Sequence, residues 1–154
     1  MTGRVSTAVT AVLVGAMTLS LTGCFENFAL GPVSLQRDGT ELLIAVCDDI
    51  EIGSVVIQTW TSGPGTPTKT VLDATGSLAL ESRSWLSVSE MADQLSVTTQ
   101  AAAPMNAGDA IVVQMQAANS RESDFNAAFT IGDEGLPEST LLHPDGRETD
   151  GPCF

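Results

Sequence analysis

The stretch that decides the fold reads IVVQMQ at residues 111–116 and FNAAFTI at residues 125–131. In both segments every second residue is apolar, and the residues between them are mostly polar or small. A period of two with one apolar face is typical of a strand in an antiparallel sheet whose other face meets solvent. The two segments therefore predict neighbouring strands that cover one core.

Similar segments recur along the chain between turns rich in Gly, Pro and Asp; they include residues 33–36, 42–47, 54–60 and 95–99. About eight or nine short strands at such spacing predict an all-β fold, an antiparallel β-sandwich, over residues 33–131. Residues 132–154 contain three prolines and several glycines. They are predicted to form an irregular C-terminal tail packed on the domain.

Two residues add a resemblance to a known architecture. Cys47 on an early predicted strand and Trp60 on the next one resemble the arrangement in immunoglobulin domains. The resemblance implies a sandwich that is immunoglobulin-like in broad architecture. An immunoglobulin pairing places its second cysteine on a late central strand, whereas Cys153 is the penultimate residue, so the sandwich prediction depends on the strand count.

The N-terminus has the pattern of an export signal. Arg4 precedes an apolar run over residues 5–20, which is short for a membrane-spanning helix. The following sequence, Leu-Thr-Gly-Cys at residues 21–24, resembles the lipobox of bacterial lipoprotein precursors. The resemblance implies a helical signal peptide over residues 1–23, lipidation of Cys24 and a tether over residues 24–32. An ordinary cleaved signal and an uncleaved membrane anchor remain alternatives.

The lipobox resemblance also implies a location. A lipidated Cys24 carries a diacylglycerol on its thiol, and two acyl chains such as palmitate on one residue suffice for stable anchoring. We therefore expect the protein at the cell membrane, on its extracytoplasmic face. The composition, with one Lys and no Tyr, is similar to that of small lipoproteins of high-GC Gram-positive bacteria. The domain itself is assigned to no defined family.

The charge balance is strongly acidic. Nineteen Asp and Glu against six Lys and Arg give a net charge of −13, which becomes −14 when Arg4 leaves with the signal. Nucleic acid is excluded as a partner because its binding requires many basic side chains. Solubility is the favoured interpretation of the acidity, and binding of cations or of a basic partner is the alternative.

Cys47 and Cys153 are predicted to form a disulfide, because an even pair of cysteines outside the cytoplasm is most simply oxidised. In the chain-entropy model, closing a loop of about 100 residues contributes about 4–5 kcal/mol to stability. The bond would staple the C-terminal tail onto the domain. A redox-active pair is disfavoured because the spacing is not CxxC.

Catalytic and metal-binding patterns are weak. His143 is the single histidine, stands in a Pro-rich segment and is predicted to lie on the surface, so no enzyme activity and no cofactor are expected. Calcium needs six to eight oxygen ligands. Acidic residues that could supply some of them form two groups, which are Asp48, Asp49 and Glu51, and Asp145 and Asp150.

Trp60 and Trp85 are the most informative apolar residues outside the alternating segments. A tryptophan on a strand usually belongs to the core, and that interpretation is favoured. If both rings were exposed near residues 61–68, they could instead form a recognition patch.

The sequence therefore predicts a membrane-anchored extracytoplasmic lipoprotein that acts as a noncatalytic binding or accessory module of the cell envelope. Its partner is expected to be an envelope protein or a wall component. A calcium-binding or small-ligand-binding lipoprotein domain is the alternative.

Overall fold

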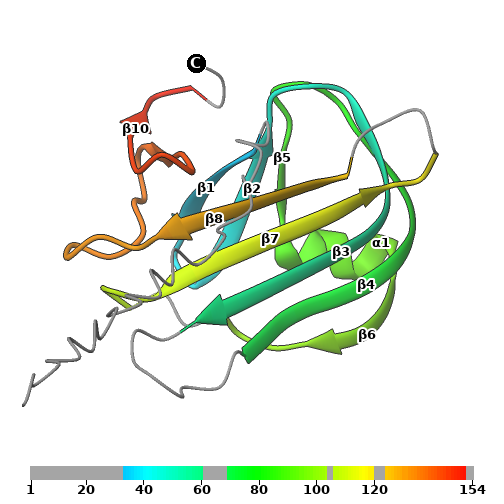
Figure 1. Cartoon of the computed structure of the whole chain (residues 1–154), viewed down its shortest axis with the longest axis horizontal. Helices are drawn as coiled ribbons and strands as arrows, with labels where there is room; N and C mark the ends of the chain where they lie inside the picture. The colour runs from blue at the N-terminus through cyan, green and yellow to red at the C-terminus, as the bar shows by residue number, and fades with distance from the viewer. Residues whose placement is uncertain (1–32, 61–68, 104–105, 120–123, 152–154) are drawn as a thin grey trace, which may run out of the picture.

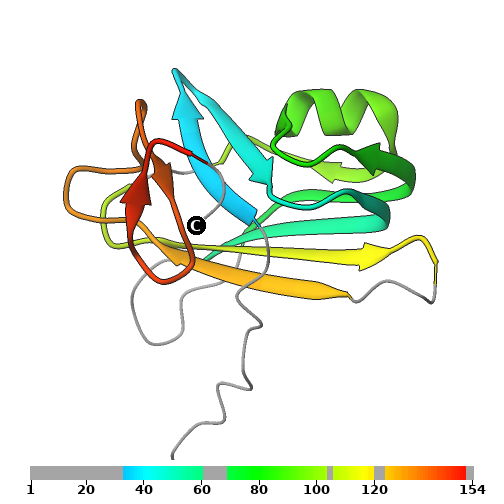
Figure 2. The ribbon, with the colours of Figure 1, turned by 90° about the horizontal axis from the view of Figure 1, so that it is seen from above.

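A computed structural model describes residues 33–60, 69–103, 106–119 and 124–151. The predicted signal peptide and tether, with Cys24, lie outside the described residues, as does Cys153. The described chain forms two five-stranded antiparallel sheets that pack face to face (Figures 1 and 2). The predicted all-β sandwich is confirmed, whereas its immunoglobulin-like detail is not.

The first sheet has the strand order β10-β9-β1-β2-β5. These strands are β10 (Glu148–Thr149), β9 (Leu141–Leu142), β1 (Val33–Asp38), β2 (Glu41–Val46) and β5 (Trp85–Ser87). The β1–β2 hairpin turns at Gly39, whose φ of 58° favours glycine. Leu35 pairs with Ile44 on the buried face of this hairpin.

The second sheet has the order β6-β4-β3-β7-β8. Its strands are β6 (Ser96–Gln100), β4 (Lys69–Leu80), β3 (Ile50–Trp60), β7 (Ala110–Ala117) and β8 (Phe125–Thr130). The alternation predicted for β8 is present, and in β7 it holds from Val113 to Gln116, whereas Val112 is buried together with Ile111 and Val113. These apolar faces meet those of β1 and β2 in one core.

One short helix, α1 (Val88–Gln94), connects the two sheets at one end of the sandwich (Figure 2). It begins with a capping box. The Ser87 hydroxyl accepts a hydrogen bond from the Glu90 backbone N–H at 3.1 Å, and the Glu90 carboxylate accepts one from the Ser87 N–H at 2.8 Å. Val88 and Met91 are buried on the side of the helix that faces the core.

The described part of the C-terminal segment is irregular apart from two short strands. Within residues 132–151, β9 pairs with β1 and β10 pairs with β9, so the tail extends the first sheet. Leu136, Leu141 and Leu142 are buried. Two-residue strands are too short to show a period of two, so this segment carries no strand signal.

No helix in the described part of the chain is long and apolar enough to cross a membrane.

Candidate functional site

The candidate site is a cleft of about 350 Å³ where the edges of the two sheets diverge beside α1. The β1–β2 turn, β4, the first turn of α1 and the end of β6 supply its walls. The described residues that line it are Thr40, Glu41, Leu42, Val71, Val88, Ser89, Gln100, Ala101, Ala102 and Ala103. A hollow of this volume falls in the range of small-molecule and peptide side-chain sites.

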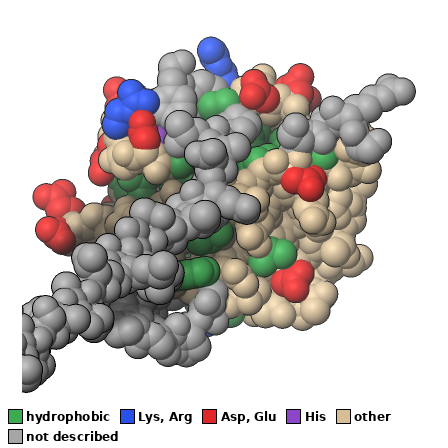
Figure 3. Space-filling view, in the orientation of Figure 1, with side chains coloured by type: hydrophobic (Ala, Val, Ile, Leu, Met, Phe, Trp, Pro, Cys, Tyr) green, Lys and Arg blue, Asp and Glu red, His purple; other side chains and the backbone are tan. Residues whose placement is uncertain are grey.

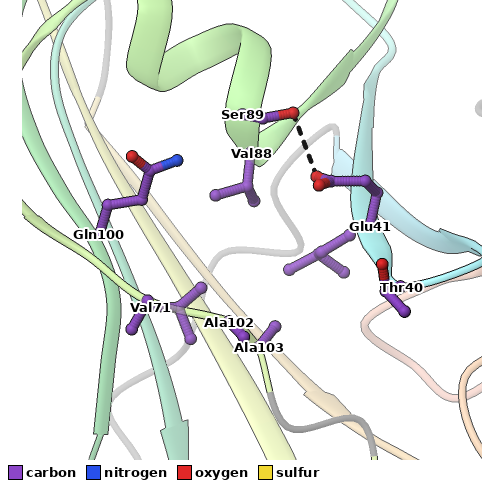
Figure 4. Close-up of a pocket in the computed structure, with 10 residues that line it drawn as sticks. Thr40, Glu41, Val71, Val88, Ser89, Gln100, Ala102 and Ala103 are labelled. Carbon is purple, nitrogen blue, oxygen red and sulfur yellow. Dashed lines mark hydrogen bonds between the residues drawn. The ribbon is translucent and has the colours of Figure 1, made fainter.

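The floor of the cleft is apolar and its rim is polar. Leu42, Val71 and Val88 are buried and form the floor. Figure 4 shows the Gln100 amide on one side of the opening and Glu41 on the other, with Val88 between them. An apolar surface bordered by a few polar groups binds a ligand by burial and orients it by hydrogen bonds.

The capping box of α1 positions the rim. By fixing the start of the helix, it presents Ser89, whose hydroxyl donates a hydrogen bond to the Glu41 carboxylate at 3.2 Å. The hydrogen bonds from the backbone and the hydroxyl of Ser87 lower the pKa of Glu90, so this carboxylate stays ionised and keeps its capping role. The S-x-x-E pattern at residues 87–90 is a sequence signal for this helix start.

Two hydrogen bonds to main-chain carbonyls hold the opposite wall of the cleft. The Ala101 N–H donates to the Val71 carbonyl at 2.8 Å, and the Lys69 ammonium donates to the Ala102 carbonyl at 3.2 Å. These contacts fix the strand end that carries Gln100. Glu41 is the one ionisable side chain among the described residues that line the cleft. The cleft thus offers apolar contact and hydrogen bonding.

His143 is not on the surface, so that prediction is wrong. Its side chain has no exposed area. Its Nδ1 lies 2.8 Å from the Ser34 hydroxyl and its Nε2 lies 2.6 Å from the Thr149 hydroxyl. Because Thr149 donates to the Gly151 carbonyl at 2.6 Å, its oxygen accepts from Nε2–H, and Nδ1 accepts from Ser34. The pairing of β9 with β1 brings these residues together across 109 positions of sequence.

The distance between Ser34 and His143 is that of a nucleophile and its base. However, the serine is not accessible to a substrate, and no carboxylate among the described residues orients the imidazole. Ser34 is 1% exposed, and the second imidazole nitrogen faces a threonine where a catalytic triad has a carboxylate. Burial lowers the pKa of His143; the Asp145 carboxylate opposes this shift and the Arg147 guanidinium adds to it. We interpret the contact as a structural link between β1 and the C-terminal segment.

Both tryptophans are exposed, at 54% for Trp60 and 40% for Trp85, so the favoured interpretation as core residues is wrong. They also do not share a patch. Trp85 borders a hollow with Leu80, which pairs with Ile50 at the start of β3, whereas Trp60 ends β3. Trp60 is ten residues after Ile50 along β3, which corresponds to about 33 Å of strand.

The candidate calcium ligands have other contacts. Asp49 accepts a hydrogen bond from the Ser82 N–H at 2.7 Å, and Glu51 accepts one from the Ser77 hydroxyl at 2.7 Å. Asp145 pairs with Arg147, whose backbone N–H and guanidinium lower the pKa of the carboxyl. Asp48 and Asp150 are exposed. Among the described residues, no group of three or more His, Cys, Asp or Glu could hold a metal ion.

The predicted disulfide cannot be assessed from the described residues, because Cys153 lies outside them. Cys47 follows β2 and is half-buried. In the first sheet, β9 and β1 separate β10 from β2. The bond between Cys47 and Cys153 stays a prediction.

Comparisons of the chain with protein-family models, with curated protein sequences and with solved structures find no match. The functional interpretation therefore depends on the geometry of the described residues and on the N-terminal sequence pattern.

Proposed function

We propose that this chain is an extracytoplasmic lipoprotein, anchored through Cys24, whose sandwich is a noncatalytic binding module of the cell envelope. The observation that carries the binding role is the cleft, with its buried floor of Leu42, Val71 and Val88 and its polar rim. The lipobox-like sequence before Cys24 supports the anchor. The presence of one ionisable lining residue supports a noncatalytic role.

The rim indicates what the cleft accepts. The Glu41 carboxylate can take a hydrogen bond from a ligand in addition to that of Ser89, and the exposed Gln100 amide can both donate and accept. The floor accepts an apolar group. A ligand with an apolar group beside a hydrogen-bond donor fits this arrangement, as does a protruding side chain of an envelope protein or a substituent of a wall polymer.

Site-specific photo-crosslinking in the native envelope tests the proposal. A photoreactive residue replaces Gln100 at the rim, and the matched control replaces Asp48, which is exposed beyond the far end of β2 from the Glu41 wall. We expect one envelope component to crosslink at Gln100 and not at Asp48. Addition of Ala102→Trp, at an exposed position that lines the cleft, should abolish that product. Equal crosslinking at both positions would contradict a role for the cleft.

A further inference from the structure

Among the described strands, β8 is an edge of the second sheet and β6 is its opposite edge. An inference about β8 is therefore independent of the cleft, to which the end of β6 contributes. The hydrogen bond of Ile131, just after β8, shows which backbone N–H and C=O groups of β8 point toward β7. The Ile131 N–H donates to the Asp109 carbonyl at 2.9 Å, so the peptide groups of Ile131 face the β7 side. Because this direction alternates along an antiparallel strand, the N–H and C=O groups of Asn126, Ala128 and Thr130 face away from β7.

The other described edges are protected. A register irregularity interrupts the pairing of β6 with β4, and such bulges twist an edge away from pairing. β5 has three residues and β10 has two. β8 has six residues, no charge, no proline and an uninterrupted register with β7. It is therefore the longest regular edge among the described strands.

Acidic residues stand at both ends of this edge. Asp124 precedes β8, and Asp133 and Glu134 follow it; all three are exposed. The Asp124 carboxylate also accepts a hydrogen bond from the Ala117 N–H of β7 at 3.1 Å, and Asp133 lies in the turn between Gly132 and Gly135. Figure 3, which views the second sheet from outside, shows only a few acidic side chains on the part of this face not hidden by grey atoms. An uncharged strand edge between two acidic ends is complementary in charge to a segment that has an uncharged centre and basic ends.

We propose that β8 binds an extended segment of a partner protein by strand addition, and that this segment has an uncharged alternating centre with Lys or Arg at its ends. Backbone hydrogen bonds to Asn126, Ala128 and Thr130 supply the affinity. The acidic ends select basic flanks and raise the association rate. A second copy of this chain fits poorly, because two-fold pairing centred on Ala128 brings Asp124 of each copy beside Asp133 and Glu134 of the other.

The test uses the full-length protein and the synthetic peptide Lys-Thr-Val-Thr-Val-Thr-Val-Thr-Val-Lys, followed by fluorescence anisotropy. We expect the peptide to bind and its affinity to fall with salt. Replacement of both terminal Lys by Glu should weaken binding at least tenfold. The variant with Asp133→Asn and Glu134→Gln should bind the Lys peptide several-fold more weakly, whereas the remote charge control Asp93→Asn should not.

A backbone variant separates strand addition from surface charge. Ala128→Pro removes an N–H that faces away from β7, so it is compatible with the fold and should reduce binding at least tenfold. Amide exchange of the wild-type protein provides a measurement that does not depend on this variant. Exchange at Asn126, Ala128 and Thr130 should slow when the peptide binds.

Three results would overturn the proposal. The first is no binding at millimolar peptide, and the second is binding without protection of these three amides. The third is a sedimentation mass that rises with concentration together with protection of the same amides in the absence of peptide, which would make a second copy the occupant.

Discussion

The buried His143 predicts that the domain loses stability in mild acid. In the folded protein, burial lowers the pKa of His143 below the ordinary 6.5, whereas in the unfolded chain the imidazole titrates normally. Above about pH 7 both states hold a neutral imidazole, so this residue contributes no pH dependence. Below about pH 6.5 the unfolded chain binds a proton that the folded chain does not bind. The free energy of unfolding should therefore fall, by at most about 1.4 kcal/mol per pH unit.

The structure also gives the cost of replacing this residue. Nδ1 and Nε2 make hydrogen bonds to Ser34 and Thr149, and the site is buried. His143→Gln replaces the imidazole with an amide that cannot reach both Ser34 and Thr149. We therefore expect the free energy of unfolding to fall by about 1–3 kcal/mol at pH 7.5. Because Gln does not titrate, the stability difference between wild type and variant should shrink as the pH falls from 6.5 to 5.5.

The assay is urea unfolding at pH 7.5, 6.5 and 5.5, followed by far-ultraviolet circular dichroism. Tryptophan fluorescence is a poorer probe because Trp60 and Trp85 are already exposed in the folded state. Carboxyl groups that titrate in this range are common to both proteins and cancel in the difference. The reasoning is refuted if the difference stays constant across the three pH values, or if the His143 ring protons titrate with an ordinary pKa in the folded protein.

Three further predictions concern the helix cap, the anchor and the disulfide. Ser87→Ala removes the N-cap of α1 and should cost about 1 kcal/mol in urea unfolding, and an unchanged midpoint would contradict the capping role. Cys24→Ser should move the protein from the membrane fraction to the soluble extracytoplasmic fraction and remove the acyl mass, whereas retention at the membrane would indicate an uncleaved anchor. The unreduced protein should have an intact mass about 2 Da below that of the dithiol form, because Cys47 and Cys153 lose two hydrogens on oxidation; thiol labelling of both residues without reductant would rule out the bond.

The strands that the sequence predicted well are those that bury one face over several residues. Residues 111–116 and 125–131 alternate because β7 and β8 each present one face to the core and most of the other face to solvent, with Val112 as the buried exception. The same reasoning could have placed Trp60 correctly. Val55, Ile57 and Thr59 of β3 are buried, so the next residue must face outward.

The features that the sequence could not predict depend on distant pairing. The burial of His143 arises because β9 pairs with β1, and nothing local to its Pro-rich segment signals that contact. The cleft likewise joins the turn at Glu41, Val71 of β4, the start of α1 and the end of β6. Its existence depends on which strands become neighbours and on where the sheets separate, and neither is encoded in the periodicity of a single segment.

The placement of charge connects the two proposed binding surfaces. Exposed acids stand at turns and strand ends, such as Asp38, Asp48, Glu81 and Asp133, while β8 carries none and the cleft carries only Glu41. Copies that come close together repel one another through these acidic ends. An uncharged or basic partner meets no such repulsion at β8 or at the cleft floor. The same distribution that opposes self-association through an open strand edge therefore leaves that edge available to a different protein.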